Sequence, residues 1–338
     1  MYHSRICLGL LAALLMVGCS GPKPYVRIEG FAQGGTYHVI SAPVRGVSEA
    51  QLRARIDSLL NDIDFTLSGY NKGSLLSRIN AGEDLPLNAL FVDCFNRSKE
   101  IWAESGGAFD PSAAPLFDLW GFGFSNKGTV TQEAIDSIRA FVGMDLLTLE
   151  TRGDGTHLVK ADPRIKLNFN AIAQGFSADA VAALLESLGS TDYLVDIGRE
   201  ILCKGHNAAG GLWRIGLDRP EDGNMEEGKN LQAVIELTGK GIVTSGNYRK
   251  FYVENGQKYA HTIDPSTGRP VTHNLLSATV IADDSTTADA YATWLMVIGE
   301  ERARELLASR GDIEALLIYD EDGQMKSFQT ENVKTEIL

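Results

Sequence analysis

Between His261 and Thr293 the chain gathers residue types that can act in catalysis or bind a metal. His261 and Asp264 lie at the end of an expected strand, and Pro265 and Gly268 then break that strand in a turn. A histidine at such a position can accept a proton near neutral pH, which makes this turn the first candidate for a catalytic site.

Asp289 and Thr293 are four residues apart in a helix that is expected to open at Ser285 or Thr286. At this spacing a carboxylate and a hydroxyl lie on one face of the helix. Two oxygen ligands on one rigid element suit a hard cation such as Mg2+, which favours phosphate-bearing substrates. In the alternative interpretation, Asp289 only faces the helix dipole and Thr293 packs in the core.

The N-terminus has the pattern of a secretory signal, with an apolar run from Ile6 to Val17 behind a short basic lead. Because Cys19 follows directly, the segment resembles a bacterial lipoprotein signal. We therefore expect a signal peptide at 1–18, lipidation of Cys19, a tether at 19–24 and one domain at 25–338. A plain cleaved signal or an uncleaved anchor is the alternative. The expected location is the bacterial cell envelope, lipid-anchored to a membrane and facing the periplasm.

Composition is that of a globular protein, with 44% hydrophobic and 22% charged residues. The net charge of -13 argues against nucleic acid as a partner, because a phosphate backbone requires clustered Lys and Arg. An anionic substrate would need a metal ion or backbone amides to offset this charge. Cys94 and Cys203 show no metal-binding spacing, so buried thiols are expected, with a disulfide as the alternative.

Helices and strands alternate irregularly along the chain, which predicts an α+β fold with largely antiparallel sheets flanked by helices. Helices are expected after Ser48, at Asn88–Glu104, at Thr131–Val142, from Gly175 to Gly189, around Asp289 and from Glu300. Strands are expected at Val26–Phe31, Tyr37–Ser41, three places in Leu146–Asn170, Tyr193–Ile197, Ile201–Gly205, Trp213–Leu217, Leu231–Leu237, Gly241–Thr244, Tyr248–Glu254, Lys258–Ile263, Ser277–Ala282 and, as the last, Ala315–Tyr319.

Several polar turns rich in Gly, Pro and aromatic residues stand at the ends of these elements. One of them, Asn168–Gly175, enters a helix N-terminus, where backbone N–H groups can bind phosphate. P-loop, HExxH and GxSxG motifs are absent from the sequence. Together the turns predict a long cleft for an extended, flat and phosphorylated ligand.

In their order along the chain, these motifs resemble those of the ApbE family of bacterial flavin transferases. The motifs are Gly34-Gly-Thr-Tyr, Ser68-Gly-Tyr, Gly107-Ala-Phe-Asp-Pro, Trp120-Gly-Phe, Ala173-Gln-Gly-Phe, Asp196-Ile-Gly, Thr244-Ser-Gly-Asn-Tyr, His261-Thr-Ile-Asp-Pro-Ser-Thr-Gly and Ala288-Asp-Ala-Tyr-Ala-Thr. The resemblance covers nearly the whole chain after the signal. It implies a single ApbE-like, T-fold-related domain with a ligand cleft between two lobes.

The resemblance also implies an activity: Mg2+-dependent transfer of FMN from FAD to a threonine hydroxyl of a target protein, with release of AMP. Metal ligands would be the Ala171 carbonyl, Asp289 and Thr293, and His261 would be the catalytic base. Asp264 either orients His261 or caps the turn before Pro265. FAD-binding residues would be Gly34, Tyr70, Ala108, Phe109, Asp110, Asn168, Gln174, Ser245 and Ile263.

Three positions depart from the family pattern. Asn168 stands where many members have Asp, Gln174 where many have Lys or Glu, and Arg199 where Gly is usual; Arg199 would either add a cation near phosphate or point to solvent. The alternatives in function are an FAD pyrophosphatase giving FMN and AMP, and a non-catalytic flavin-binding lipoprotein. A subunit of a sodium-pumping or electron-transfer membrane complex is the expected acceptor protein.

Overall fold

A computed structural model describes residues 24–125, 127–221, 228–247, 251–254 and 257–337. The predicted signal peptide, the lipidated Cys19 and nearly all of the tether lie outside the described residues. No helix among the described residues is long and apolar enough to cross a membrane.

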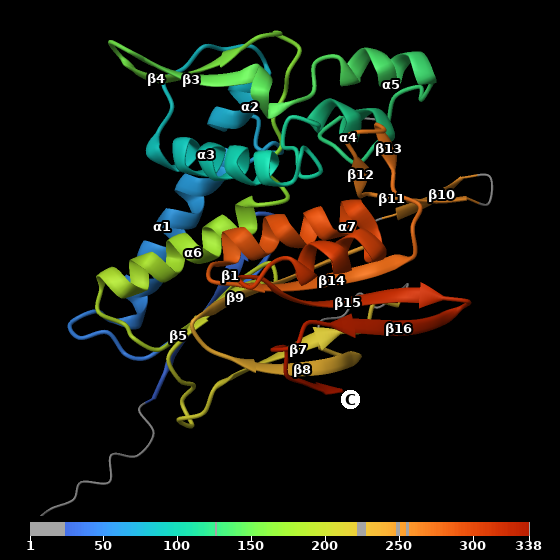
Figure 1. Cartoon of the computed structure of the whole chain (residues 1–338). Helices are drawn as coiled ribbons and strands as arrows, with labels where there is room; N and C mark the ends of the chain where they lie inside the picture. Colours follow the sequence, from blue (N-terminus) through green and yellow to red (C-terminus); the bar gives the residue numbers. More distant parts are fainter. Residues whose placement is uncertain (1–23, 126, 222–227, 248–250, 255–256, 338) are drawn as a thin grey trace, which may run out of the picture.

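A sheet of eight strands forms the centre of the molecule, and every neighbouring pair in it is antiparallel (Figure 1). Its order is β1 (Val26–Ala32), β2 (Gly35–Ser41), β5 (Tyr193–Ile197), β6 (Glu200–Lys204), β9 (Lys240–Gly246), β14 (Leu275–Ala282), β15 (Glu314–Glu321) and β16 (Gln324–Gln329). The expected antiparallel α+β architecture is thus confirmed.

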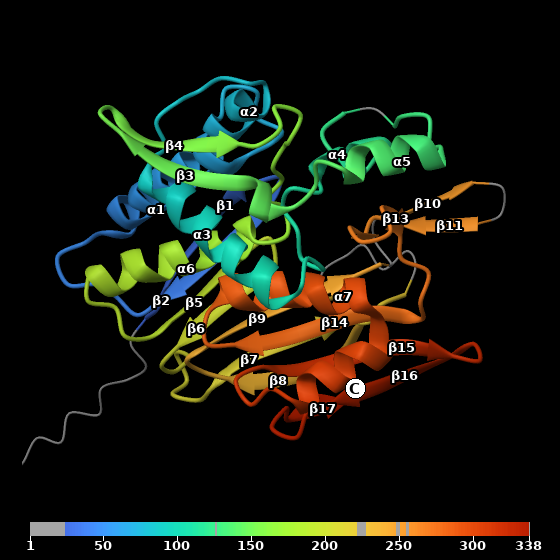
Figure 2. The same ribbon diagram turned by 45° about the horizontal axis from the view of Figure 1, so that its top comes forward.

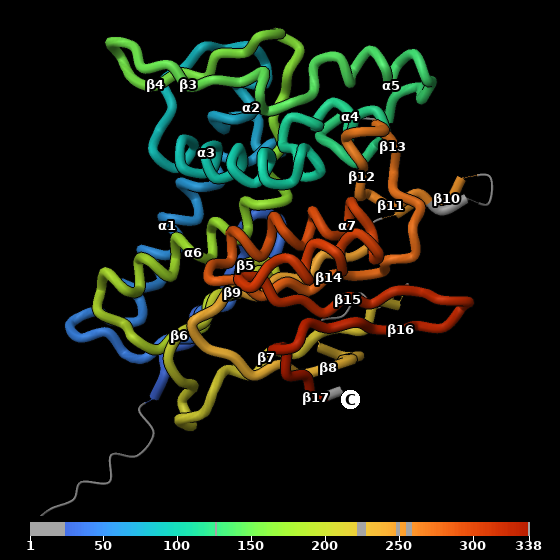
Figure 3. The backbone as a smooth tube through the Cα atoms, viewed as in Figure 1, coloured from blue at the N-terminus to red at the C-terminus, as the bar shows by residue number. Residues whose placement is uncertain are grey.

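Helices cover one face of this sheet (Figure 2). They include α1 (Glu49–Leu67), α3 (Ala89–Glu104), α6 (Ala173–Ser187) and α7 (Ser285–Ala308). The expected cap Ser48 forms a capping box with Gln51, satisfying two backbone N–H groups at the start of α1. Helix α7 packs on β9 and β14 and lies beside α6, as the backbone trace in Figure 3 shows.

The opposite face is covered by a second, three-stranded antiparallel sheet. It consists of β7 (Trp213–Asp218), β8 (Leu231–Leu237) and β17 (Thr335–Ile337). Trp213, Ile215 and Ile235 from this sheet pack against Ile201 and Ile242 of the central sheet. Successive side chains of β6 point to opposite faces of the central sheet. Ile201 faces the small sheet, while Leu202 packs in the hydrophobic cluster under α1 and α6.

Smaller elements form the upper part of the molecule in Figure 1. They are α2 (Leu75–Asn80), α4 (Ala114–Trp120), α5 (Gln132–Arg139), the 3-10 turn η1 (Met144–Leu146) and the pairs β3–β4 (Leu147–Arg152, Gly155–Lys160), β10–β11 (Phe251–Glu254, Gln257–Ala260) and β12–β13 (Ile263–Asp264, Arg269–Pro270).

Several sequence predictions need correction. Leu146–Asn170 holds two strands, not three, because after β4 the chain makes only an isolated bridge between Ala113 and Lys166. The helix expected from Glu300 is the second half of α7, which bends at Gly299, where φ is 81°. β15 is not the last strand, since β16 and β17 follow it. Cys94 and Cys203 are buried free thiols, as expected.

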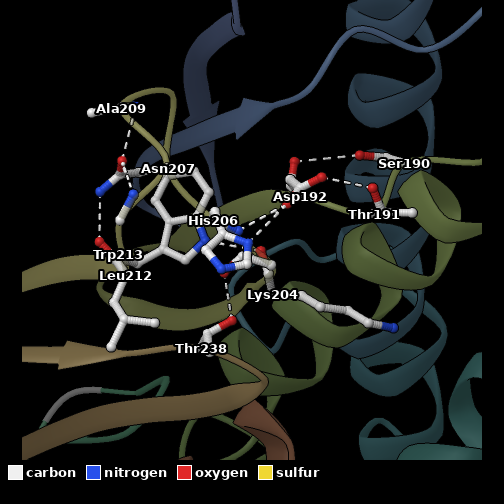
Figure 4. A network of polar contacts seen from close by, with 12 residues as sticks. Ser190, Thr191, Asp192, Lys204, His206, Asn207, Ala209, Leu212, Trp213 and Thr238 are labelled. Atoms are coloured by element: carbon white, nitrogen blue, oxygen red, sulfur yellow. Dashed lines mark hydrogen bonds and ion pairs between the residues drawn. The ribbon is translucent and has the colours of Figure 1, made fainter. Parts of the chain in front are cut away.

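At the end of the sheet where β5 begins and β6 ends, a network of polar contacts joins several turns (Figure 4). Asp192 accepts a hydrogen bond from the backbone N–H of His206 at 2.9 Å and another from the Thr191 hydroxyl at 2.7 Å. Asn207 accepts from the N–H groups of Ala209 and Gly211 and donates to a third backbone group, the carbonyl of Leu212. These contacts fix the chain between β6 and β7.

Candidate active site

A cavity of about 290 Å³ lies where the helical face of the central sheet meets the upper part of the molecule. Segments far apart in the sequence meet in its wall, which brings together nearly all of the predicted site residues. Its lining includes Tyr70, Ala108, Phe109, Asp110, Asn168, Ala171, Gln174, Ser245, His261, Ile263, Asp289 and Thr293. Two predicted residues, Gly34 and Asp264, are not in the lining.

The metal-ligand candidate Asp289 lies where the N-terminal parts of α6 and α7 cross. Its side chain is only 5% exposed, and Oδ2 accepts the backbone N–H of Gly175 at 3.0 Å. In return, Asp179 of α6 accepts the backbone N–H groups of Ser285 and Thr286 at 2.8 Å each. Each helix thus supplies a carboxylate that satisfies otherwise unpaired N–H groups of the other.

Gly175 is required at this crossing, because a Cβ atom there would lie 2.4 Å from the carbonyl oxygen of Ser285. Burial raises the pKa of Asp289 to about 7. A carboxylate held in this way gains from a nearby cation, since the charged form is otherwise poorly solvated. Thr293, one turn further along α7, and Ala171, just before α6, line the same cavity.

These residues fit a hard cation by the chemistry of their donor atoms. No group of three or more His, Cys, Asp or Glu residues placed to hold a metal occurs in the described part of the chain. A cation beside Asp289 would therefore take much of its coordination from carbonyl, hydroxyl, water or substrate oxygens. Mg2+ is commonly held in that manner, by one or two carboxylates together with substrate phosphates.

His261 lies between β11 and β12 and contributes to the cavity wall, with its ring 6.4 Å from that of Phe122 in an edge-on arrangement. The next residue, Thr262, donates its hydroxyl to Asn247 at 2.7 Å. The carboxylate of Asp264 accepts hydrogen bonds from the Ser266 N–H at 2.8 Å and from the Ser266 hydroxyl at 2.7 Å. Of the two roles considered for Asp264, the structure supports capping of the turn.

Tyr70 also lines the cavity; it is 59% exposed and packs edge-on against Phe124, with ring centroids 4.8 Å apart. Asn170 donates to its hydroxyl at 3.2 Å. Glycine at position 69 leaves room for the Phe124 ring that Tyr70 contacts, because a Cβ atom there would clash with that ring. An exposed aromatic ring at the mouth of a cavity is suited to stacking on a flat ligand.

Asp110 is held in place by neighbouring donors. Its Oδ1 accepts from the N–H and the hydroxyl of Ser112, and its Oδ2 from the Trp102 indole at 3.2 Å. Burial nevertheless raises its pKa to about 6. Its neighbour Phe109 is part of the main hydrophobic core, which makes this stretch of the wall rigid.

Two further residues considered from the sequence, Gly34 and Arg199, do not line this cavity. Gly34 is exposed in the turn between β1 and β2, with φ at 79°. Arg199 donates to Oδ2 of Asp218 at 2.6 Å, and both residues line a second cavity of about 270 Å³ that also contains Ile215 of the small sheet. An ion pair with Asp218 of β7 thus holds the guanidinium of Arg199 beside this second cavity.

Glu200 is a lining residue that the sequence reasoning missed, although it directly follows the noted Asp196–Arg199 turn. Its Oε2 is buried and has no hydrogen-bond partner among the described residues. Burial first, and then the negative charge of Asp289, raises the pKa of Glu200 well above its usual range. The alternation of β6, in which Ile201 and Cys203 face the small sheet, could have placed Glu200 on the helical face.

Comparison with known proteins adds independent information. A family model described as "ApbE family" matches residues 34–317. A protein from Escherichia coli K12 named FAD:protein FMN transferase is 34% identical over 348 residues, covering 99% of this chain and 97% of the relative. A protein of the same name from Vibrio cholerae is 35% identical over 331 residues, covering 96% of both chains.

Solved structures give the same picture. A structure titled as the flavin transferase ApbE from Vibrio cholerae is similar with a TM-score of 0.79 and 34% identity, covering 91% of this chain and 98% of that one. The apo form of a flavinyl transferase ApbE from Pseudomonas stutzeri matches with a TM-score of 0.79 and 31% identity, covering 91% and 95% of the two chains.

Proposed function

The chain belongs to the ApbE family, and from this we propose that it is an FAD:protein FMN transferase, an enzyme that moves FMN from FAD to a protein. The observation that carries this function is the convergence on one cavity of His261, Asp289 and Thr293 with the predicted flavin contacts. A base and a cation held by oxygen ligands can promote transfer from a pyrophosphate to a hydroxyl, and an exposed aromatic ring can bind the flavin.

In the proposed reaction, a threonine hydroxyl of the acceptor attacks the phosphorus on the FMN side of the FAD pyrophosphate. The new bond joins that phosphorus to the threonine oxygen, and the bond to the bridging oxygen breaks, so that AMP leaves. His261 accepts the hydroxyl proton. General-base assistance of this type contributes about 10²–10⁴-fold to a rate.

Magnesium is part of the proposal. Asp289, Thr293 and the carbonyl of Ala171 would hold it, since they offer oxygen donors at one side of the cavity. When bound there, Mg2+ would neutralise charge on the pyrophosphate during transfer. The hydrogen bond from the Gly175 N–H to Oδ2 restricts the orientation of the Asp289 carboxylate, which supports this assignment.

Tyr70, Asp110, Asn168 and Gln174 are the proposed contacts for FAD. Tyr70 offers an exposed ring face for the flavin. Asn168 and Gln174 are neutral, and their amide groups can form hydrogen bonds with polar groups of FAD without adding charge. Their neutrality is expected to affect affinity for FAD more than the type of reaction.

We further propose that the protein is lipid-anchored through Cys19 in the cell envelope, facing the periplasm. The argument is the sequence pattern of residues 1–19. The acceptor would then be an envelope protein, for which a subunit of a sodium-pumping or electron-transfer complex is the expected class. Replacement of Cys19 by Ser should release the protein from the membrane fraction and abolish acyl labelling; unchanged labelling would reject the anchor.

The function is tested by incubating the protein with FAD, Mg2+ and an acceptor domain, followed by in-gel flavin fluorescence and AMP measurement. Transfer predicts acceptor fluorescence and AMP in equal amounts. AMP with free FMN and a dark acceptor band would instead identify an FAD pyrophosphatase. Bound FAD with no AMP would identify a flavin carrier without turnover.

A further inference from the structure

The cavity that is proposed to bind a pyrophosphate has an unusual charge balance. Three carboxylates, Asp110, Glu200 and Asp289, are in its lining, and the described residues that line it include neither Lys nor Arg. An anionic ligand would meet repulsion from such a wall unless cations screened it. The charge compensation must therefore come from bound cations or from groups outside this set.

Glu200 differs from the other buried acids near the cavity. Asp110 accepts bonds from Ser112 and Trp102, Asp289 accepts from Gly175, and Asp179 accepts from two backbone N–H groups and a hydroxyl. The Oε2 atom of Glu200 has no hydrogen-bond partner among the described residues, although it is buried. A buried oxygen of a carboxylate without a partner is costly, so its retention points to a ligand.

Glu200 lines the same cavity as Asp289 and Thr293, the proposed cation ligands. Glu200 is the first residue of β6 and alternates with Ile201, which faces the small sheet, so its side chain lies on the face covered by α6 and α7. Glu200 Oε2 and the Gln174 amide both approach the backbone at Gly198, where an added Cβ would lie 3.3 Å from that oxygen and 2.1 Å from the amide nitrogen.

We propose that Glu200 is a second carboxylate of the divalent-cation site, acting with Asp289 so that the protein contributes two negative charges to it. The proposal deepens the proposed function, because it concerns the cation of the same site. Two carboxylates together with phosphate oxygens are an ordinary ligand set for Mg2+ or Mn2+. Binding the cation between them would also supply the partner that Glu200 Oε2 lacks.

Mn2+ is the probe for this proposal, because its free ion is detected directly by electron paramagnetic resonance. Titrations would be made without FAD on the wild type, on Glu200→Gln and on Glu301→Gln, a control that removes an exposed carboxylate from α7. We expect Glu200→Gln to weaken Mn2+ binding by about 10–100-fold. Glu301→Gln should remain within about twofold of the wild type, a difference too small to reflect loss of a ligand.

Thermal unfolding gives a second readout that a purely structural role would not produce. In EDTA, Glu200→Gln should melt at or above the wild-type temperature, because a carboxyl group that burial makes costly to ionise has been replaced by a neutral amide. Added Mn2+ should then stabilise the wild type more than the variant. If Glu200→Gln does not fold, Glu200→Asp, which keeps the charge and shortens the side chain, should show the same weakening.

Mn2+ affinity within about twofold of wild type in these variants would overturn the proposal, even if activity were lost. The outcome is separable from the proposed function, which is judged by FMN transfer with the wild type alone. Weakened Mn2+ binding with no wild-type transfer would leave Glu200 as a metal ligand in a protein of another activity.

Discussion

The β5–β6 hairpin has a cavity end, at Glu200, and a far end, at Asp192 and His206. The acidic residues at the two ends differ in their hydrogen bonding. At the far end, Asp192 accepts hydrogen bonds from the Thr191 hydroxyl and the His206 N–H, which lower its pKa. At the cavity end, burial raises the pKa of Glu200. Its Oε2 atom has no hydrogen-bond partner among the described residues. Buried polar groups are normally satisfied, and this unsatisfied oxygen belongs to the end of the hairpin that lines the active-site cavity.

The backbone follows the same contrast. Arg199, next to Glu200, has φ at 92°. This left-handed backbone conformation costs free energy for any residue other than glycine. At the far end, the corresponding positive φ belongs to Gly205, which also leaves room for the Asp192 carboxylate. One end is built for stability, while the other tolerates strain and unmatched charge.

A large effect on transfer is expected at His261, which lines the cavity, and His206 at the far end provides the matched control. His261→Ala should slow FMN transfer by at least about 10²-fold, because the proposed base is lost. FAD binding, followed by flavin fluorescence, should persist, since Tyr70 and Asn168 remain. His206→Ala is the matched control and should transfer normally. Transfer by His261→Ala within about threefold of wild type would remove the histidine from the mechanism.

A smaller effect, on stability alone, is expected at the far end. Asn207→Ala removes an acceptor for the N–H groups of Ala209 and Gly211 and a donor to Leu212. The free energy of unfolding in urea should fall by about 1–2 kcal/mol, with transfer unchanged. In Asn332→Ala, which loses only an exposed hydrogen bond to Glu314, the free energy of unfolding should fall by less. An equal loss in both variants would contradict the assigned role of this network.

Arg199→Gly tests whether the strained residue takes part in catalysis. Glycine relieves the positive φ but leaves the buried Asp218 carboxylate without its guanidinium partner, so the free energy of unfolding should fall by about 1–3 kcal/mol. FMN transfer should stay within about twofold, a change of well under 1 kcal/mol in the barrier, because the guanidinium lines the other cavity. A tenfold loss of transfer would bring Arg199 into the active site.

The smallest effect concerns a third acid cluster, on the β3–β4 hairpin, where His157 bonds Asp84 at 2.7 Å and Asp154 at 3.0 Å. Its bond to Asp84 is the main cause of a raised pKa for His157. Protonated His157 therefore stabilises the fold fully below about pH 6.5, and this contribution is lost as pH rises through the folded pKa. His157→Gln should lose more stability at about pH 5 than at about pH 9; a reversed trend would refute the pairing.

Much of the fold could be predicted from local signals. Ser48 caps α1 as expected, and Asn88 and Thr131, at which helices are expected to start, cap α3 and α5. In each case a side-chain oxygen ahead of the helix satisfies one of its first free N–H groups. β16 was missed because its residues are mostly polar and partly exposed. Such a strand is held by pairing with β15 and not by its own pattern.

The site was predictable where motif residues converge, and less so where tertiary contacts decide. His261, Asp289 and Thr293 meet as predicted in one cavity. Asp264 could be assigned to its turn only from its contacts with Ser266. Glu200 was missed because a lone glutamate after a turn carries no signal until strand register turns it toward α7. The contact of Arg199 with Asp218 likewise depends on how two sheets pack.

The most direct test removes one charge from the cavity, on α7, and one from the far end of the β5–β6 hairpin. Asp289→Asn keeps an oxygen for the Gly175 N–H but loses the metal-binding charge, and Asp192→Asn is its counterpart at the far end. Both would be assayed for Mg2+-dependent FMN transfer and for melting temperature. The account predicts that Asp289→Asn abolishes transfer while still folding, and that Asp192→Asn transfers normally. Normal transfer by Asp289→Asn at ordinary Mg2+ concentrations, or equal loss in both variants, would contradict it.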